Sequence, residues 1–190
     1  MNDKLRYKIK DVKNPYISSW SFKEKFLIVL WRVFYFLFFR TSPKIMGRYW
    51  RVCLLRVFGC KIHWKAFVFS SSKIYAPWLL KIGERACIGP KCEVYNLGPV
   101  EIGDFSTISQ NVYICNGSHD LSLKSLPLII GDIYIGENVF IGANAFILPG
   151  IKINDFAVIG AASVVTRDVG KYEMVGGNPA KVIKKREING

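Results

Sequence analysis

A six-residue spacing of aliphatic residues constrains the fold of this chain more than any other feature. An α-helix repeats every 3.6 residues and an isolated strand every 2.0, so neither alone returns a side chain to one face at this interval. A triangular coil of three short strands does, with one inward aliphatic side chain per strand. The spacing therefore predicts a solenoid whose stacked coils bury one another's inward faces. The strictest run is Ile129, Ile135, Ile141, Ile147, Ile153, Ile159 and Val165.

The same spacing occurs upstream in blocks that begin at Ile62, Ile82 and Ile102, each one coil plus two residues. The later members of these blocks are Val68 and Ile74, then Ile88 and Val94, then Ile108 and Ile114. Glycine repeatedly follows the inward aliphatic residue, where we expect the chain to bend or to pack closely. These glycines are Gly83, Gly89, Gly103, Gly136, Gly142 and Gly160.

The N-terminal part follows a different pattern. Residues Phe26 to Phe39 form an apolar run broken by Arg32, and a basic and apolar stretch follows from Arg48 to Phe58. The run is shorter than the ~20 residues that span a bilayer. We predict two helices whose apolar faces rest on the solenoid. A helix lying on an anionic membrane surface is the alternative. The predicted domains are residues 1–58 (polar tail and helical segment), 59–175 (solenoid) and 176–190 (basic tail).

The composition favours an anionic partner. Lys and Arg number 27 against 14 Asp and Glu, a formal charge of +13, which suits nucleic acid, an acidic membrane or a phosphorylated small molecule. The first 20 residues lack the apolar core of a cleavable signal peptide, so we expect a cytoplasmic protein. The five cysteines form no C-x-x-C pair and suit buried positions in a reducing compartment. They are Cys53, Cys60, Cys87, Cys92 and Cys115.

Several motifs resemble a known family. The segment IGENVFIGANAFILPGIKINDFAVIGAASVVTRDV, with GGNPAKVIKKR after it, resembles the closing coils of hexapeptide-repeat acyltransferases. The motifs YAPWLLKIGE, YNLGPVEIG and ICNGSHD look most like the colanic-acid-biosynthesis acetyltransferases and are similar to the maltose and galactoside O-acetyltransferases. The resemblance implies an all-β, left-handed parallel β-helix, a homotrimer, and acetyl-CoA bound between neighbouring helices. Only the resemblance gives the left hand, because crossover connections are right-handed in about 98% of cases.

The hexapeptide spacing breaks between Ile114 and Ile129, where an insertion runs from Cys115 to Pro127. We predict a catalytic loop over residues 115–128, because departures from a regular solenoid usually carry function. His119 lies in this loop and matches the catalytic histidine of the family. Imidazole suits a general base at neutral pH. Either Asp120 or a backbone carbonyl could orient the ring. The other histidine, His63, has a structural role in this interpretation.

The family resemblance also implies the binding residues. The acetyl-CoA contacts carry over to Ala143, Ala161, Thr166, Arg167, Lys181 and Lys184. Small side chains would let the pantetheine arm approach the backbone, and the cations would face phosphates. Glu93 and Asn96 are candidate contacts to the acceptor. We expect no metal requirement.

We therefore predict an O-acetyltransferase acting on a sugar of an exopolysaccharide, capsule or lipopolysaccharide, with an acceptor that is free or carried on a lipid at the inner membrane face. N-acetylation of an amino sugar, and a non-catalytic scaffold at the membrane, stay open. Carbonic anhydrases of this fold use three histidines per site, and this chain has two. No nucleic-acid-binding motif accompanies the charge, so we expect no nucleic-acid partner.

Overall fold

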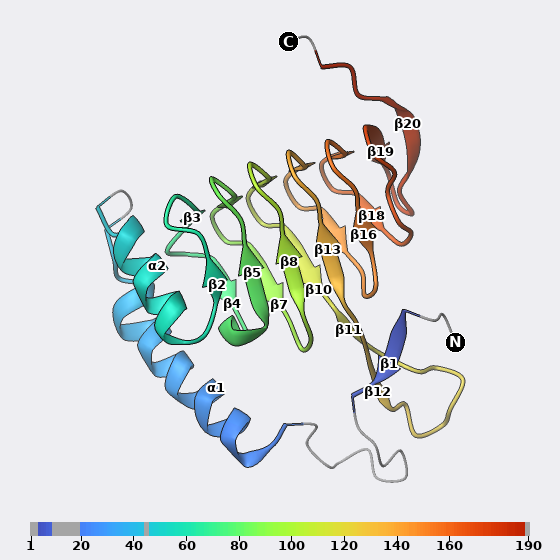
Figure 1. Ribbon diagram of the computed structural model, residues 1–190. Coiled ribbons are helices and arrows are strands. Elements are labelled where there is room, and N and C mark those ends of the chain that lie inside the picture. The colour runs from blue at the N-terminus through green and yellow to red at the C-terminus, as the bar shows by residue number, and fades with distance from the viewer. Residues whose placement is uncertain (1–3, 9–19, 44–45, 189–190) are drawn as a thin grey trace.

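The computed structural model describes residues 4–8, 20–43 and 46–188. Most of this chain winds into a parallel β-helix whose coils stack along one axis, with the helices at one end (Figure 1). The first wall contains β2 (Lys61–Ile62), β5 (Leu80–Ile82), β8 (Val100–Ile102), β13 (Ile133–Ile135) and β16 (Lys152–Ile153). The second contains β3 (Phe67–Val68), β6 (Cys87–Ile88), β9 (Thr107–Ile108), β14 (Phe140–Ile141), β17 (Val158–Ile159), β19 (Glu173–Gly176) and the antiparallel β20 (Lys181–Lys185). The third contains β4 (Lys73–Ile74), β7 (Glu93–Tyr95), β10 (Tyr113–Cys115), β15 (Phe146–Ile147) and β18 (Val164–Val165).

The inward aliphatic residues stack in register, as the six-residue spacing predicts. In the first wall Ile62 lies opposite Ile82, Ile82 opposite Ile102, and Ile102 opposite Ile135. These side chains are almost completely buried. Each coil therefore completes the core of the coil beside it, and burial of this column is a main source of solenoid stability.

The corners explain how the chain turns so tightly. Non-glycine residues adopt the left-handed conformation there, although this region is sterically unfavourable for them. At Phe105, for example, the backbone N–H donates to the carbonyl of Glu84 in the preceding coil at 2.8 Å, which supports the conformation. Gly103 shows why glycine is needed after an inward residue, since a Cβ there would lie 2.5 Å from the carbonyl oxygen of Gly136. The other such corner residues are Arg85, Lys91, Asn111, Asn138, Asn144, Phe156, Ala162 and Tyr172.

Helices cover the first coil, as predicted. Helix α1 (Phe22–Phe34) continues into the π-helical turn η1 (Tyr35–Phe39), and α2 (Arg48–Val57) follows. The first helix begins earlier than the apolar run because Ser21 and Glu24 form a capping box. Trp31 is buried against the solenoid and donates its indole N–H to the carbonyl of Ile74 at 2.7 Å. A short 3₁₀ helix, η2 (Pro77–Leu79), lies within the first coils. No helix among the described residues is long and apolar enough to cross a membrane.

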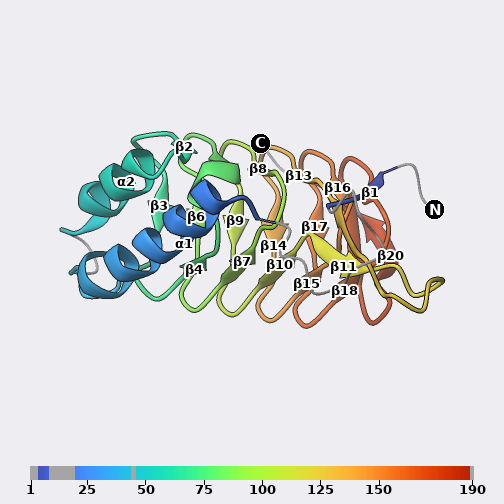
Figure 2. The same cartoon turned by 90° about the horizontal axis from the view of Figure 1, so that it is seen from below.

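A small antiparallel sheet stands outside the solenoid (Figures 1 and 2). It contains β11 (Gly117–His119), β12 (Leu128–Gly131) and the N-terminal β1 (Leu5–Tyr7). We call residues 116–132 the excursion and residues 4–8 the strap. The assignment of Ile129 as an inward repeat residue is wrong, because it lies in β12 opposite Tyr7 and Ser118. The first wall resumes at β13 instead.

Candidate active site

His119 ends strand β11 of the excursion and is exposed. Its Nδ1 atom lies 2.6 Å from the carbonyl oxygen of Leu126, across the turn that joins β11 to β12. A carbonyl oxygen can only accept a hydrogen bond, so Nδ1 must carry the proton. In the neutral ring the lone pair then lies on Nε2. The excursion thus holds one imidazole in the tautomer that can accept a proton at its outer nitrogen.

Asp120 does not contact the His119 ring, although it was a candidate for orienting it. Its carboxylate accepts hydrogen bonds from the Ser122 hydroxyl and from the Tyr7 hydroxyl, each at 2.6 Å. These bonds, with that of Ser122 the larger influence, lower the pKa of Asp120. The prediction that Asp120 orients His119 is therefore corrected: the Leu126 carbonyl, the backbone alternative, contacts the ring. Asp120 instead shapes the loop beyond the histidine and ties it to the strap.

The strap joins the excursion to the solenoid, and sequence analysis missed it. Tyr7 pairs with Ile129 in β12, so the strap is the outer strand of the excursion's sheet. Its side chains also reach in several directions. The polar contacts are Lys4 with Asp168, Arg6 with Asp132 at 2.7 Å, Tyr7 with Asp120, and Lys8 with the carbonyl of Leu97. The strap therefore links His119's loop to coils on both sides of it.

Lys8 sits in an unusual environment for a lysine. Its ammonium lies 3.3 Å from the centre of the Trp20 ring, a cation–π contact. Burial lowers its pKa to about 8. Trp20 in turn contacts Tyr75 and Trp78 of the solenoid, with ring centres 5.9 and 6.5 Å away. Lys8 thus fastens the end of the strap against an aromatic cluster beside α1.

Asn116 forms the base of the excursion. Its side chain is fully buried, and Oδ1 accepts from the backbone N–H groups of Leu97 at 2.8 Å and Gly98 at 3.2 Å. Asn96 occupies the matching position one coil earlier and is equally buried. It pairs with both backbone groups of Ala76, at 2.9 and 2.7 Å. The prediction that Asn96 contacts the acceptor is therefore wrong, because its side chain is enclosed and both its polar atoms are bonded.

Glu93, the other candidate acceptor contact, lines a cavity of about 330 Å³ between α1 and the third wall. Its carboxylate pairs with Lys73 at 3.5 Å. The lining is aromatic and charged, and it includes Trp31, Arg32, Tyr35, Tyr75 and Tyr95. Tyr95 lies opposite Cys115 in β10, the strand that leads into the excursion. One strand of the cavity wall, β7, therefore lies beside the strand that leads into the excursion.

The expected acetyl-CoA residues lie on the last coils. Ala143 and Ala161 occupy corresponding corners between the second and third walls, where a Cβ on Gly142 would lie 2.6 Å from the Ala161 nitrogen. Thr166 and Arg167 are exposed and follow β18, at the corner between the third and first walls. In an earlier coil, the excursion leaves the solenoid at the equivalent corner. Lys181 and Lys184 are exposed on β20. The structure thus brings these residues to one end, with Arg167 next to the strap's partner Asp168.

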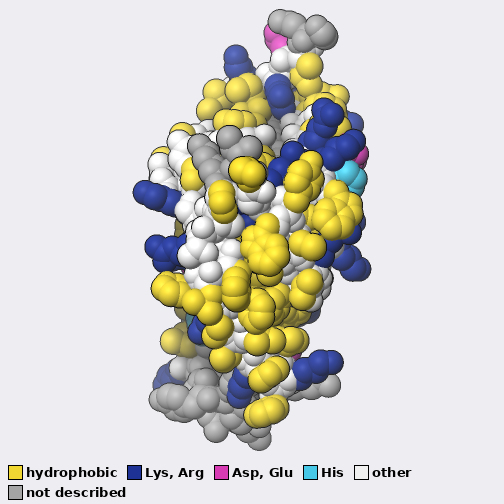
Figure 3. All heavy atoms as spheres, turned by 90° about the vertical axis from the view of Figure 1, so that its left-hand side faces the viewer, with side chains coloured by type: hydrophobic (Ala, Val, Ile, Leu, Met, Phe, Trp, Pro, Cys, Tyr) yellow, Lys and Arg dark blue, Asp and Glu magenta, His cyan; other side chains and the backbone are white. Residues whose placement is uncertain are grey.

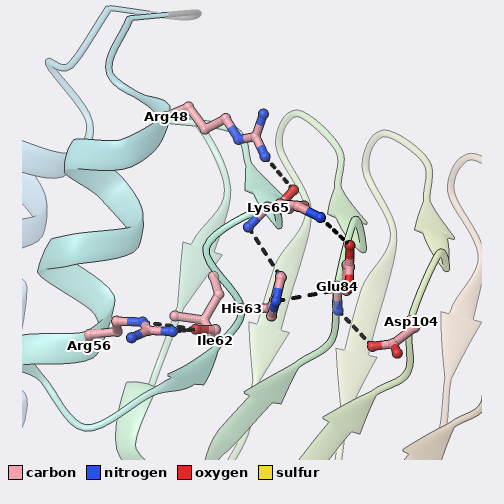
Figure 4. A network of polar contacts seen from close by, with 7 residues as sticks. All are labelled: Arg48, Arg56, Ile62, His63, Lys65, Glu84 and Asp104. Atoms are coloured by element: carbon pink, nitrogen blue, oxygen red, sulfur yellow. Dashed lines mark hydrogen bonds and ion pairs between the residues drawn. The ribbon is translucent and has the colours of Figure 1, made fainter.

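His63 lies far along the solenoid from the excursion, in a polar network at the first coils (Figure 4). Its Nδ1 accepts from the backbone N–H of Lys65 at 3.2 Å, and its Nε2 lies 4.0 Å from Glu84. Lys65 also pairs with Glu84 at 2.8 Å, and Glu84 N–H donates to Asp104 in the next coil. This network ties coils together, in keeping with a structural role. Among the described residues, no group of three or more His, Cys, Asp or Glu side chains is arranged to hold a metal ion.

Two family models match the solenoid. Residues 132–167 match the model described as bacterial transferase hexapeptide (six repeats), and residues 80–115 match the hexapeptide repeat of succinyl-transferase. The chain is 38% identical over 159 residues to WcaF of Escherichia coli strain K12, named as a colanic acid biosynthesis acetyltransferase. That match covers 84% of this chain and 87% of the relative.

Solved structures agree with this assignment. A maltose O-acetyltransferase from Clostridium difficile 630 is 30% identical, with a TM-score of 0.69 over 87% of each chain. A galactoside acetyltransferase in complex with coenzyme A has the same fold, with a TM-score of 0.81 at 23% identity over 90% of this chain and 86% of that one. The predicted left-handed parallel β-helix with an N-terminal helical segment is confirmed. The chain belongs to the hexapeptide-repeat family of acetyl-CoA-dependent acetyltransferases.

Proposed function

We propose that this protein transfers the acetyl group of acetyl-CoA to a hydroxyl group of a sugar, with His119 as the general base. The observation that carries the proposal is the bond between the Leu126 carbonyl and Nδ1 of His119. That bond leaves the exposed Nε2 as the basic atom of the neutral ring. A base of this kind is what a sugar hydroxyl needs in order to attack a thioester at neutral pH.

In the proposed reaction, Nε2 takes the hydroxyl proton while the sugar oxygen bonds to the thioester carbonyl carbon. The tetrahedral intermediate then breaks its carbon–sulfur bond, and the imidazolium returns the proton to the departing thiolate. The acetyl ester and free CoA result. No acyl-enzyme is needed, because a thioester is already activated. Cys115, the thiol nearest to His119 in the chain, is a poor nucleophile because burial raises its pKa.

Acetyl-CoA would lie along the last coils. We propose that Ala143 and Ala161 border the pantetheine arm, where their small side chains leave backbone groups accessible. Thr166, Arg167, Lys181 and Lys184 are exposed and would face the phosphates, since charge-assisted hydrogen bonds are the strong ones. The galactoside acetyltransferase with the same fold contains coenzyme A, which supports this co-substrate.

We propose a homotrimer with the reaction centre between protomers. Leu121, Leu123 and Leu126 are exposed at the tip of the excursion, and Leu121 is the most exposed of the three, at 82%. Three exposed leucines beside a catalytic base form a surface that a neighbouring protomer would cover. The excursion would then present His119 to acetyl-CoA held against that neighbour.

The acceptor would be a sugar of a polysaccharide repeat unit, free or carried on a lipid, and the protein would work in the cytoplasm. The relation to WcaF supports a role in exopolysaccharide, capsule or lipopolysaccharide biosynthesis. Glu93 would contact the acceptor within the aromatic cavity. Aromatic rings with a few hydrogen-bonding groups suit sugars, which have apolar faces and polar edges.

The test is release of CoA thiol from acetyl-CoA with a panel of oligosaccharides and amino sugars, comparing wild type, His119→Ala and the matched control His63→Ala. Loss of a general base should lower the rate about 10²–10⁴-fold in His119→Ala, while His63→Ala keeps its rate. Cleavage of the product by hydroxylamine distinguishes an ester from the amide of an amino sugar. A folded His119→Ala enzyme with the wild-type rate would refute the assignment of the base.

A further inference from the structure

The helical cap, residues 20–43 and 46–58, carries a large apolar face that the solenoid does not cover. Figure 3 shows hydrophobic side chains spread over this end of the molecule, with Lys and Arg around them. Several are highly exposed, among them Phe22 at 87% and Met46 at 88%. The exposed large apolar side chains of the cap are Phe22, Phe26, Val29, Val33, Phe36, Leu37, Phe38, Met46, Tyr49, Trp50 and Val57. Apolar patches of this kind mark interaction surfaces.

The helix α1 is apolar on two faces. Ile28 and Trp31 are buried and face the solenoid. Phe22, Phe26, Val29 and Val33 recur at intervals of three and four residues, so they form one stripe along the helix. Because packing on the solenoid accounts for only the first face, the outer stripe needs a separate explanation.

The charge around this stripe is almost entirely positive. Lys25 and Arg32 are seven residues apart, two helical turns, and border the stripe on one side. Lys23 lies toward its other side, and Arg40 follows η1. Glu24 is the only acidic residue in the described part of the cap, and its carboxylate accepts from Ser21 at 2.8 Å.

We propose that this face docks on an anionic phospholipid bilayer, with α1 lying parallel to the membrane plane. An apolar stripe flanked by cations is the arrangement of helices that lie in the headgroup region without crossing the membrane. Aromatic side chains such as Phe26 and Trp50 suit that interface. A two-fold contact with a second copy is the weaker fit, because it would place the same lysines and arginines of both chains against each other.

The docking face adjoins the aromatic cavity. Arg32 lines that cavity together with Glu93, and it also borders the outer groove formed by Val29, Val33 and Phe36. A docked protein would thus hold its cavity next to the headgroups. If the proposed sugar acceptor is carried on a lipid, this placement brings the acceptor to the third wall. That conclusion rests on the proposed function, whereas membrane docking does not depend on it.

The experiment is co-sedimentation of the full chain with two kinds of vesicle. One kind contains phosphatidylcholine alone, and the other also contains roughly 30 mol% of the anionic lipid phosphatidylglycerol. We expect binding to the anionic vesicles only, weakening as salt rises. The variants are Lys23→Glu/Lys25→Glu and Phe26→Ser/Val29→Ser/Val33→Ser. Each cation near an anionic surface contributes roughly fivefold in affinity, so the charge variant should bind at least about 25-fold more weakly.

The matched control is Lys152→Glu/Lys171→Glu, which changes the net charge equally but lies on the later coils. It should bind as wild type does, because its lysines do not face the membrane. The proposal fails if wild type does not sediment with anionic vesicles, or if the control loses as much binding as the cap variant. It fails equally if the serine variant, shown to be folded by its circular dichroism spectrum, binds vesicles normally but changes its oligomeric state. The apolar face would then be a contact between protomers.

Discussion

Replacing Asn116 with alanine tests what holds the excursion to the solenoid. The change removes the acceptor for the backbone N–H groups of Leu97 and Gly98, both of which are buried. An unsatisfied buried donor costs about 1–3 kcal/mol, so loss of the acceptor for both donors should lower the free energy of unfolding by about 2–6 kcal/mol. The third bond, from Nδ2 to the carbonyl of Pro99, adds little because Pro99 is exposed and that oxygen also accepts from Ile133 N–H.

Asn96→Ala is the matched control. Asn96 is the same residue at the same corner one coil earlier, and it satisfies both backbone groups of Ala76. Its loss should destabilise the fold by about 1–3 kcal/mol for the N–H group left unpaired. No excursion starts at this corner, however. Under conditions where both variants are folded, Asn116→Ala should therefore lose turnover, while Asn96→Ala should keep it.

The stability of both variants can be measured by urea unfolding, and their turnover by CoA thiol release. Amide hydrogen exchange at Leu97 and Gly98 reports directly on the two donors, whose protection should fall in Asn116→Ala. Two results would contradict the reasoning. One is an unfolding free energy of Asn116→Ala within ~0.5 kcal/mol of wild type, the scatter of ordinary surface changes. The other is an equal loss of turnover in folded Asn96→Ala.

Three further predictions concern the strap and the coils. Tyr7→Phe removes the hydroxyl bonded to Asp120, so a protease should cut the excursion faster while the thermal midpoint of the solenoid stays constant; unchanged cleavage would argue against the strap's role. Burial holds the pKa of Lys8 at about 8, below 10.5, so the unfolded chain binds more protons between these values. Wild-type stability relative to Lys8→Met should therefore rise over that pH window, on the order of 1 kcal/mol after allowance for solvent, and a pH-independent difference in urea unfolding would refute this. Gly103→Ala should cost about 2 kcal/mol or more, since its Cβ would lie 2.5 Å from a carbonyl oxygen; Gly160→Ala, with its nearest neighbours at 3.3 Å, should cost clearly less, and equal thermal shifts would count against the close-packing argument.

The solenoid could be predicted because its contacts repeat at a fixed spacing along the chain. Every inward residue meets an equivalent residue of the adjacent coil, as Ile82 meets Ile62 and Ile102. The amino-acid pattern therefore predicts the architecture of the solenoid but not its handedness, which depends on how the corners turn. The glycines after the inward residues carry the same information, because each marks a place where the next coil's backbone comes within contact distance.

The error at Ile129 has a physical cause. A strand of the excursion buries its isoleucine nearly as well as a solenoid strand does, and Ile129 is only 7% exposed. Hydrophobic spacing records burial but not the partner. Ile129 faces Tyr7 and Ser118 in antiparallel strands, and nothing in its own segment distinguishes this from a parallel neighbour one coil away.

The strap was beyond sequence prediction for a related reason. Its strand, Leu5–Tyr7, is too short for any periodicity. The partners of these three residues lie more than a hundred residues away, as with Arg6 and Asp132. Asp120 shows the consequence for the site. It is next to His119 in sequence, but successive side chains of an extended chain point to opposite sides, so its carboxylate meets Tyr7 and Ser122. The reversal of the chain then brings the carbonyl of Leu126 to the His119 ring.

The arrangement of the strap suggests why the excursion can be both long and well positioned. A loop of this length closed only at its two ends would lose much conformational entropy on ordering. Here a third strand is added from outside the loop, and that strand also reaches Asp168 through Lys4. Asp168 follows Arg167, one of the residues expected to meet CoA phosphates. The same five residues thus fix the proposed base relative to the end of the solenoid that carries the expected acetyl-CoA contacts, so the order of the loop and the geometry of the reaction centre depend on one element.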